Sequence, residues 1–244
     1  MSCTLTMKHY REILEAALKA GYVFRGFHQP LSSEKYVVYL RHDLDVCLEE
    51  ALDMAALEAE LGIQATYFVL VNSPLYNLLS EDSLEFLHEL ANKGHWIGLH
   101  IDPAMLPTDA PNKMEKLVSK LIEFYEAVFQ LVPVVSFHRP SPNILGRDFG
   151  AFVSVYSPRF FEEVKYISDS RGMWREGCPC QIVRKRQYPS LQMLVHPIWW
   201  KFTETESLSD RLHYLLGERL KLFRHYLGVN IEPIRKLLEK EEAK

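Results

Sequence analysis

An α/β fold built on parallel strands is predicted by three observations on this sequence. Short apolar runs rich in Val, Ile, Leu and aromatic residues alternate along the chain with longer segments of helical periodicity. These apolar runs are nearly continuous, which is typical of strands that are covered on both faces. Five of them end abruptly in polar or charged residues. We therefore expect a barrel of parallel strands surrounded by helices, with a site at the carboxyl ends of the strands.

Strands and helices alternate from residue 37 onward. The first strand, 37–45 (VVYLRHDLD), precedes a helical pattern over 47–62 that ends at Gly62, a typical C-terminal cap. The other strands that we expect lie at 63–71, 95–102, 134–140, 164–170 and 190–197. The other helices lie at 80–94, which begins with a Ser/Asp cap, and at 111–131.

The 244 residues are expected to form a single domain, 1–244, because no linker, repeat or low-complexity segment divides them. With 48% hydrophobic and 25% charged residues, the composition is that of an ordinary globular protein. The barrel core is expected to span about residues 35–203. Residues 208–244 are strongly helical and charged, which predicts C-terminal helices packed outside the core.

Charge and hydropathy exclude several classes of function. The formal net charge is −4 and there is no block of Lys and Arg, so we expect no nucleic-acid partner. No stretch approaches the roughly 20 apolar residues that span a bilayer, so we expect no transmembrane segment. The N-terminal segment is amphipathic and charged throughout, without the apolar core of a signal peptide, which favours a cytoplasmic location.

The four cysteines are too few for a disulfide framework in a chain of this length. Cys178 and Cys180 flank Pro179 in a spacing that fits neither the redox nor the zinc CxxC pattern. Because no second pair completes a four-sulfur site, we expect free thiols, with a part in metal binding as the alternative. Cys47 is expected to be a small buried residue and not a nucleophile.

Polar side chains lie at the carboxyl ends of five of the expected strands. In a parallel barrel these ends lie together at one end of the barrel, so we expect the side chains to be neighbours. These residues are Asp43 and Asp45, His100 and Asp102, His138 and Arg139, Asp169, and His196. A mixed set of imidazoles and carboxylates suits a divalent metal such as zinc, and a catalytic zinc keeps one position open for water. The sequence therefore predicts a hydrolytic site, in which a carboxylate takes a proton and a histidine protonates the leaving group.

The order of these motifs resembles that of the NodB-homology polysaccharide deacetylases. The motifs that carry the resemblance are RHDLD at 41–45, GHWIGLH at 94–100, HRPSP at 138–142, ISDSRGMW at 167–174 and LVHP at 194–197. The resemblance implies a distorted (β/α) barrel with extra terminal helices. It also implies a metal-dependent hydrolase that removes an acyl group, here expected to be acetyl, from a sugar in the biosynthesis or modification of a bacterial surface polysaccharide.

The resemblance implies a role for four residues of the reaction. Asp43 corresponds to the general base, and Arg139 to the arginine that orients this base. His196 corresponds to the histidine that assists departure of the leaving group. Asp169 matches the aspartate of the fourth motif, and we expect it to partner His196, raising the pKa of the imidazole and fixing its tautomer.

The metal site departs from the family pattern at one position. The resemblance implies Asp45 and His100 as ligands, but the family's further histidine, four residues after the first, is here Ala104. The candidates to replace it are Asp102, His138 and His42. We favour His138, because its imidazole comes from a different strand end. The expected cofactor is a divalent metal, zinc.

Other residues have structural as well as functional interpretations. For His42 and His95 we expect a structural hydrogen-bonding role, since a strand-end histidine often anchors a turn. Trp174 and Trp199 are candidates for stacking on the acylated sugar, with a place in the core as the alternative. The missing histidine at Ala104 keeps a second function open: a catalytically inactive carbohydrate-binding or regulatory protein on the same barrel.

Overall fold

The computed structural model describes residues 3–30, 33–203 and 205–242. The chain forms two compact units, Met1–Lys201 and Phe202–Lys244.

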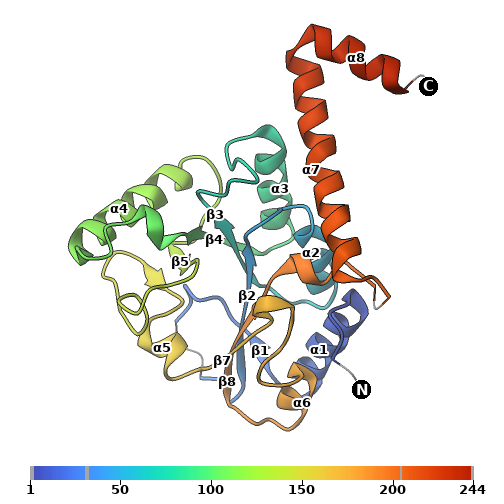
Figure 1. Cartoon of the computed structure of the whole chain (residues 1–244). Helices are drawn as coiled ribbons and strands as arrows, with labels where there is room; N and C mark the ends of the chain where they lie inside the picture. Colours follow the sequence, from blue (N-terminus) through green and yellow to red (C-terminus); the bar gives the residue numbers. More distant parts are fainter. Residues whose placement is uncertain (1–2, 31–32, 204, 243–244) are drawn as a thin grey trace. The chain divides into compact units, whose positions relative to one another are not determined.

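A parallel sheet forms the centre of the first unit (Figure 1). Its spatial order is β6 (Val153–Ser154), β5 (Val134–Phe137), β4 (Trp96–Ile101), β3 (Thr66–Leu70), β2 (Val37–Leu44), β8 (Ser190–Val195) and β7 (Lys165–Ser168), with β1 (Val23–Phe24) also paired to β2. Every pairing is parallel. Among the described residues β6 and β7 do not pair with each other, so the curled sheet is an open half-barrel. The predicted α/β fold is confirmed.

Burial explains why the longer strands were recognisable in the sequence. All eight residues of β2 are buried, as a continuous apolar run predicts for a strand covered on both faces. Each of the six predicted strands contains an observed strand of the sheet. The two-residue strands β1 and β6 were not predicted, because two residues are too short for a periodic pattern.

Helices follow the strands and cover the sheet (Figure 1). They are α1 (Met7–Lys19), α2 (Ala51–Glu60), α3 (Glu81–Asn92), α4 (Pro111–Glu126), α5 (Pro158–Phe161) and α6 (Pro179–Arg184), with 3-10 turns η1 (Pro103–Met105), η2 (Ser170–Gly172) and η3 (Pro197–Trp199). α2 begins at Ala51, later than the predicted residue 47, because the preceding residues form the turn out of β2. It ends before Gly62, whose φ of +70° is the left-handed cap conformation that the sequence predicted.

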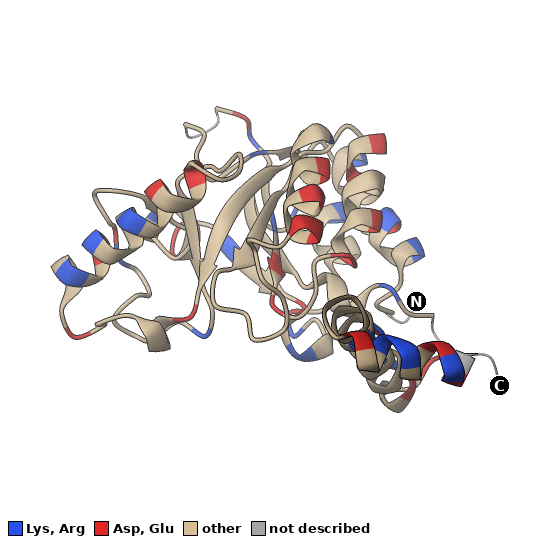
Figure 2. Cartoon of the chain, turned by 90° about the horizontal axis from the view of Figure 1, so that it is seen from above, with Lys and Arg blue, Asp and Glu red and all other residues tan. Residues whose placement is uncertain are grey.

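The hydrophobic core lies between the sheet and the helices. α1 contributes Tyr10, Ile13 and Leu14, each with 0% exposure, so the core includes residues that precede the predicted boundary at 35. Each fully buried side chain of this size stabilises the fold by about 1.5–3 kcal/mol. Figure 2 shows Lys, Arg, Asp and Glu interspersed on the helices, while the strands carry few charged residues. The charged residues inside the sheet are therefore exceptions that need a partner.

The second unit contains α7 (Leu208–Asn230) and α8 (Glu232–Glu242). α7 begins with a capping box, in which the Ser207 N–H donates to Asp210 Oδ2 at 2.8 Å and the Asp210 N–H donates to Ser207 Oγ at 3.2 Å. Of the predicted C-terminal helices, residues 243–244 lie outside the described residues. Within the described chain, each helix is too short or too polar to cross a bilayer.

Candidate metal and active site

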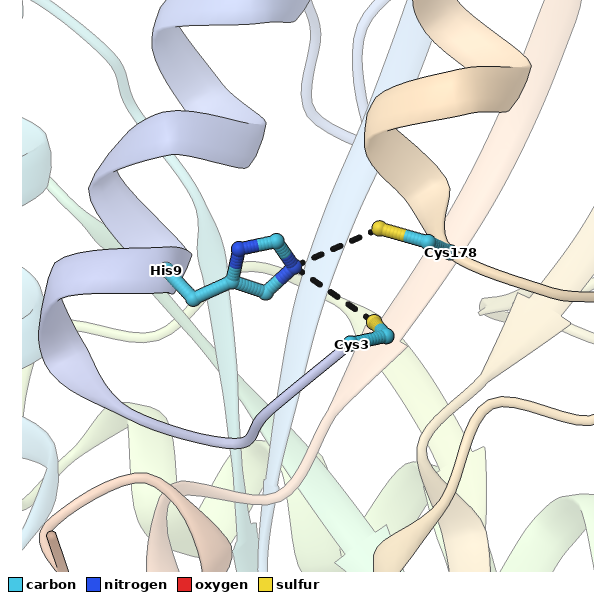
Figure 3. Close-up of side chains that lie close together, drawn as sticks. All are labelled: Cys3, His9 and Cys178. Carbon is cyan, nitrogen blue, oxygen red and sulfur yellow. Dashed lines mark hydrogen bonds between the residues drawn. The ribbon is translucent and has the colours of Figure 1, made fainter. Parts of the chain in front are cut away.

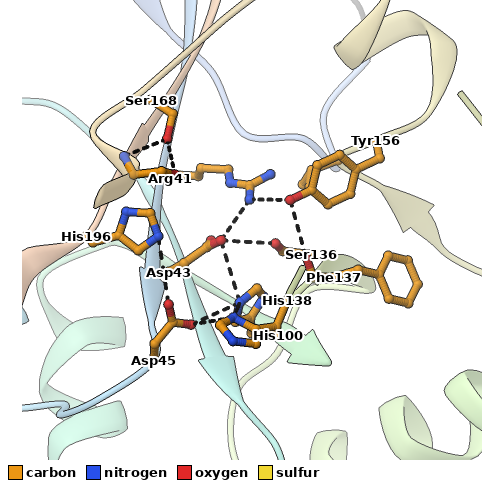
Figure 4. Close-up of polar contacts among 12 residues, drawn as sticks. Arg41, Asp43, Asp45, His100, Ser136, Phe137, His138, Tyr156, Ser168 and His196 are labelled. Atoms are coloured by element: carbon orange, nitrogen blue, oxygen red, sulfur yellow. Dashed lines mark hydrogen bonds and ion pairs between the residues drawn. The ribbon is translucent and has the colours of Figure 1, made fainter. Parts of the chain in front are cut away.

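Polar side chains from four strand ends meet at the carboxyl edge of the sheet (Figure 4). Asp43 lies near the end of β2 and Asp45 follows it, while His100 lies in β4 and His138 and His196 follow β5 and β8. Parallel strands end at the same edge of a sheet, so these residues become neighbours although they are distant in sequence. They line one cavity of about 480 Å³.

Three ligand atoms in this cavity form a nearly equilateral triangle. Asp45 Oδ1 lies 3.1 Å from His100 Nε2 and 3.2 Å from His138 Nδ1, and the two imidazole nitrogens are 3.3 Å apart. In a tetrahedral zinc site with bonds of about 2.0–2.1 Å, two such ligand atoms lie about 3.3 Å apart. One carboxylate and two imidazoles at this spacing fit a small divalent cation.

The pairing of the strands positions the two histidines. His100 in β4 is paired with Ser136 in β5, and the His138 N–H donates to Ile101 O at 2.9 Å, which continues this pairing to the strand end. β4 packs closely here, because a Cβ at Gly98 would lie 2.6 Å from the Phe68 ring and 2.8 Å from a backbone oxygen of β5. Glycine at this position therefore lets β4 bring His100 to the cavity.

The charges in this cluster favour an ionised Asp45. Burial favours the neutral carboxyl group, but the contacts with the His100 and His138 imidazoles and the charges of His100 and His196 outweigh burial and hold the pKa of Asp45 well below its usual range. The contact that the His138 Nδ1–H makes with the Asp45 carboxylate in turn raises the pKa of His138. The oxygen of Asp45 that would bind a cation therefore lies against both imidazoles.

The other two candidates for the third ligand have different partners. Asp102 accepts from the Ala104 N–H at 2.9 Å and from Arg139 Nη2 at 2.6 Å, so both of its oxygens are used. Ala104 itself belongs to the turn η1, which Asp102 caps. His42 points to the opposite face of β2, where its Nε2 lies 2.7 Å from Glu58 Oε1. The structure brings His138, which we favoured, to Asp45 and His100.

Asp43 is held by a buried polar network next to the triangle of Asp45, His100 and His138. Arg41 Nη2 donates to Asp43 Oδ2 at 2.7 Å and to the Tyr156 hydroxyl at 3.0 Å, while Arg41 Nη1 donates to Gln192 Oε1 at 2.8 Å. The Ser136 hydroxyl also donates to Asp43 Oδ2, at 3.3 Å. Burial opposes ionisation of Asp43, but the Arg41 charge outweighs it and the pKa of Asp43 is lowered.

The arginine beside Asp43 is Arg41 and not Arg139, to which the resemblance assigned the orienting role. Arg139 lines the cavity, but its side chain is 74% exposed and its guanidinium pairs with Asp102. The sequence did not lead us to predict Arg41 as the partner of Asp43, although the spacing within RHDLD allowed that prediction. Residues two apart in a strand share one face, so a buried Arg41 had to lie beside Asp43.

His196 lines the same cavity beside Asp45, with its imidazole held by Asp169. His196 Nδ1 lies 2.6 Å from Asp169 Oδ1, and the Trp200 indole N–H donates to Asp169 Oδ2 at 2.7 Å. His196 Nε2 faces Asp45 Oδ2 at 3.8 Å. Burial favours the neutral imidazole, but the hydrogen bond and charge of Asp169 outweigh burial and raise the pKa of His196. The predicted pairing of Asp169 with His196 is present, and Trp200 is a further partner that sequence reasoning did not identify.

Trp174 and Trp199 are half-buried and do not belong to the residues that line the cavity. The Trp174 ring packs against the Trp200 ring, with centroids 6.2 Å apart, and Trp199 lies against Gly172. The aromatic side chains that do line the cavity are Phe137, Tyr156, Phe161 and Tyr166. None of these four was singled out in the sequence, because aromatic side chains are common in the hydrophobic core of any globular protein.

His42 and His95 belong to a buried network between the sheet and α2. Glu58 Oε1 lies 2.7 Å from His42 Nε2, and Glu58 Oε2 accepts from the Tyr67 hydroxyl at 2.7 Å. His95 accepts from the Ala65 N–H at 3.2 Å, and its Nε2 lies 2.9 Å from Ala55 O. These contacts give both histidines the structural role that the sequence favoured.

No protein-family model matches the chain, and no curated protein is similar to it in sequence. Similar solved structures include a CE4 family pseudoenzyme from Bacillus anthracis, with 14% identity and a TM-score of 0.42 over 83% of this chain and 65% of that chain. A mutant of that pseudoenzyme with restored enzymatic activity has 14% identity and a TM-score of 0.40 over 83% and 67% of the two chains. A family 4 carbohydrate esterase from Bacillus anthracis has 15% identity and a TM-score of 0.39 over 93% and 86%. The chain thus spans slightly less than two thirds of the first of these structures.

Proposed function

We propose that this protein is a metal-dependent hydrolase that removes an acetyl group from a sugar. The observation that carries the proposal is the triangle of Asp45, His100 and His138, with Asp43 and His196 beside it in the same cavity. This arrangement supplies a cation site, a base and an acid around one cavity, which is what acyl hydrolysis requires.

Asp45, His100 and His138 are the residues that would hold the cation, which we propose to be zinc. A bound divalent cation polarises the acyl carbonyl and lowers the pKa of a nearby water molecule. The protein contributes the position of these ligands, set by the pairing of β4 with β5.

Asp43 acts as the general base in this proposal. Its lowered pKa keeps it ionised at neutral pH, and Arg41 and Ser136 both bind the same oxygen, Oδ2. The other oxygen, Oδ1, is buried without a hydrogen-bond donor among the described residues. It is therefore free to accept the proton of the attacking water as the water oxygen bonds to the acyl carbon.

His196 acts as the general acid. Asp169 binds the imidazole at Nδ1, so the protonated Nε2 faces the cavity. As the bond between the acyl carbon and the sugar nitrogen or oxygen breaks, His196 gives its proton to that leaving atom. The raised pKa of His196 supports this role, because the group must be protonated near neutral pH.

The cavity supports a sugar-sized substrate. Its volume of about 480 Å³ lies within the usual range for small-molecule sites. Tyr156, Phe161 and Tyr166 line it, and aromatic side chains offer apolar surface for one face of a sugar ring. We propose, from the motif resemblance, that this sugar is part of a bacterial surface polysaccharide or its precursor.

Acetate release from an N-acetylated sugar oligomer tests the proposal directly. The full chain is stripped with a chelator, reloaded with zinc, and compared with Asp43→Asn loaded in the same way. We expect release by the zinc-loaded wild type and a loss of it in the stripped protein and in Asp43→Asn. Sugar binding by a folded, zinc-loaded wild type without any release would overturn the proposal in favour of the non-catalytic carbohydrate-binding protein.

A further inference from the structure

A second group of metal-ligating side chains lies outside the candidate active site (Figure 3). Cys3 precedes α1, His9 lies in the first turn of α1, and Cys178 caps the start of α6. His9 Nε2 is 3.4 Å from Cys3 Sγ and 3.3 Å from Cys178 Sγ. Folding thus joins two thiols and an imidazole from opposite parts of the sequence.

We propose that Cys3, His9 and Cys178 form a second metal site, which binds one zinc ion and joins the N-terminal segment to α6. This site is independent of the proposed hydrolase activity. For Cys178 the proposal takes metal binding, the alternative to a free thiol. The other two ligands are Cys3 and His9, and no second pair of cysteines is needed.

The geometry and the ligand types both fit zinc. Zn–S bonds of about 2.3 Å and Zn–N bonds of about 2.0–2.1 Å place sulfur and nitrogen about 3.5 Å apart in a tetrahedron. The two observed separations, 3.4 and 3.3 Å, are close to this value. Thiolate and imidazole ligands select zinc over the hard cations Mg²⁺ and Ca²⁺, which prefer oxygen.

The orientation of His9 is an independent observation that points to a ligand. His9 Nδ1 lies 3.1 Å from Glu12 Oε2, one turn further along α1. A carboxylate on one imidazole nitrogen fixes the tautomer and leaves the other nitrogen as a donor to the metal, as in many zinc sites. The nitrogen that remains, Nε2, is the one that faces both sulfurs.

The position of the site suggests a structural function. α6 lies in the chain between Asp169 and His196, and α1 packs beside α2 and α6. Zinc at Cys3, His9 and Cys178 would tie α1 to this segment, and structural zinc contributes directly to the free energy of unfolding. Loss of this zinc should therefore lower the melting temperature while the side chains of the candidate active site stay in place.

Cobalt substitution tests the site with a signal that the other cluster lacks. The full chain, in reducing buffer, is stripped with a chelator and titrated with Co²⁺ alone. We expect a thiolate-to-cobalt charge-transfer band in the near ultraviolet, since Asp45, His100 and His138 contain no sulfur. The band should be lost in Cys178→Ser and retained in Cys47→Ser, a matched control at a buried cysteine outside the group. Circular dichroism checks that each variant is folded.

Two further variants separate this site from the candidate active site. His100→Ala should retain the sulfur band and one tightly bound zinc per chain, and adding Cys178→Ser should remove that zinc. Glu12→Gln should keep the band but weaken Co²⁺ binding by about 10–100-fold, the usual effect of losing a carboxylate that orients a ligand. Absence of the band in folded wild type contradicts the proposal, and so does its persistence in Cys178→Ser. Neither result bears on acetate release, which depends on the other cluster.

Discussion

Arg41 donates a hydrogen bond to Asp43 at 2.7 Å, from two residues earlier on the same strand. Both side chains are buried on the cavity face of β2, and Arg41 has 0% exposure. An arginine in this position needs a carboxylate partner, because an unpaired buried charge costs several kcal/mol. The same contact keeps Asp43 ionised and leaves its Oδ1 oxygen without a hydrogen-bond donor among the described residues, so one ion pair serves both the fold and the proposed chemistry.

Replacing Arg41 by Gln should raise the pKa of Asp43, because the positive charge that opposes burial is removed. We expect the acid limb of the pH–rate profile to move to higher pH. The free energy of unfolding should fall by about 3–5 kcal/mol, the cost of breaking a buried pair. Arg139→Gln, at an exposed arginine, should change the free energy of unfolding by less than about 1 kcal/mol. Urea unfolding measures the free energy of unfolding, and the pH–rate profile reports the pKa of Asp43. Equal pH–rate profiles for Arg41→Gln and Arg139→Gln would mean that Arg41 does not orient Asp43.

Asp43→Asn should lower turnover by about 10²–10⁴-fold, the usual contribution of a general base. The amide oxygen can still accept from Arg41, so we expect the variant to fold and to bind metal. Steady-state acetate release, circular dichroism and metal content are measured on the same preparation. Undiminished turnover in a variant of normal metal content would exclude Asp43 as the base.

His138→Ala should weaken zinc binding at the candidate active site by at least about 100-fold, since losing even an outer partner of a ligand costs 10–100-fold. Asp102→Asn is the matched control, because Asp102 pairs with Arg139 and not with the triangle. Competition with a zinc chelator gives both affinities. Both variants should carry Cys178→Ser, so that the second site is not counted. A larger effect in the control would identify Asp102 as the third ligand.

His196→Ala should keep metal binding but lose most of the turnover on a sugar acetamide, whose amine leaves poorly without a proton. The loss should be smaller on an aryl ester, whose leaving group needs no acid. The raised pKa of His196 means that activity should fall as pH rises through that pKa, and His196→Ala should lack this alkaline limb. Equal losses on both substrates would make His196 a binding or packing residue.

Glu58→Gln should destabilise the fold in a pH-dependent way. Burial favours the neutral acid, but the charges of His42 and His95 and the hydrogen bonds with His42 and Tyr10 outweigh burial and lower the pKa of Glu58 below its usual value. Ionised Glu58 therefore contributes stability above its unfolded pKa, and this contribution is lost as pH falls through the lower folded pKa.

The difference in the free energy of unfolding between wild type and Glu58→Gln should thus be about 3–5 kcal/mol at neutral pH and shrink in acid. Asp53→Asn, at an exposed carboxylate in the first turn of the same helix, should differ from wild type by about 1 kcal/mol or less. Denaturant unfolding across this pH range provides the measurement. A difference that grows in acid would contradict the assigned charge state.

The sequence by itself determined the α/β class, the longer strands and the residues at their ends. These features are local: a strand covered on both faces needs a continuous apolar run, and a helix end in the left-handed conformation favours a glycine such as Gly62. The strand-end positions of Asp45, His100 and His138 followed from parallel topology, since all strands of a parallel sheet end at one edge.

Only the tertiary structure decided which side chains share a partner. His138 meets Asp45 and His100 because β5 pairs with β4, whereas Asp102 is used by Arg139. Which residue becomes the third member of the triangle depends on the pairing between strands that are distant in sequence. The sequence of one strand does not specify the strand with which it pairs. The group of Cys3, His9 and Cys178 makes the same point, because packing of α1 beside α6 brings together ligands that no local spacing predicts.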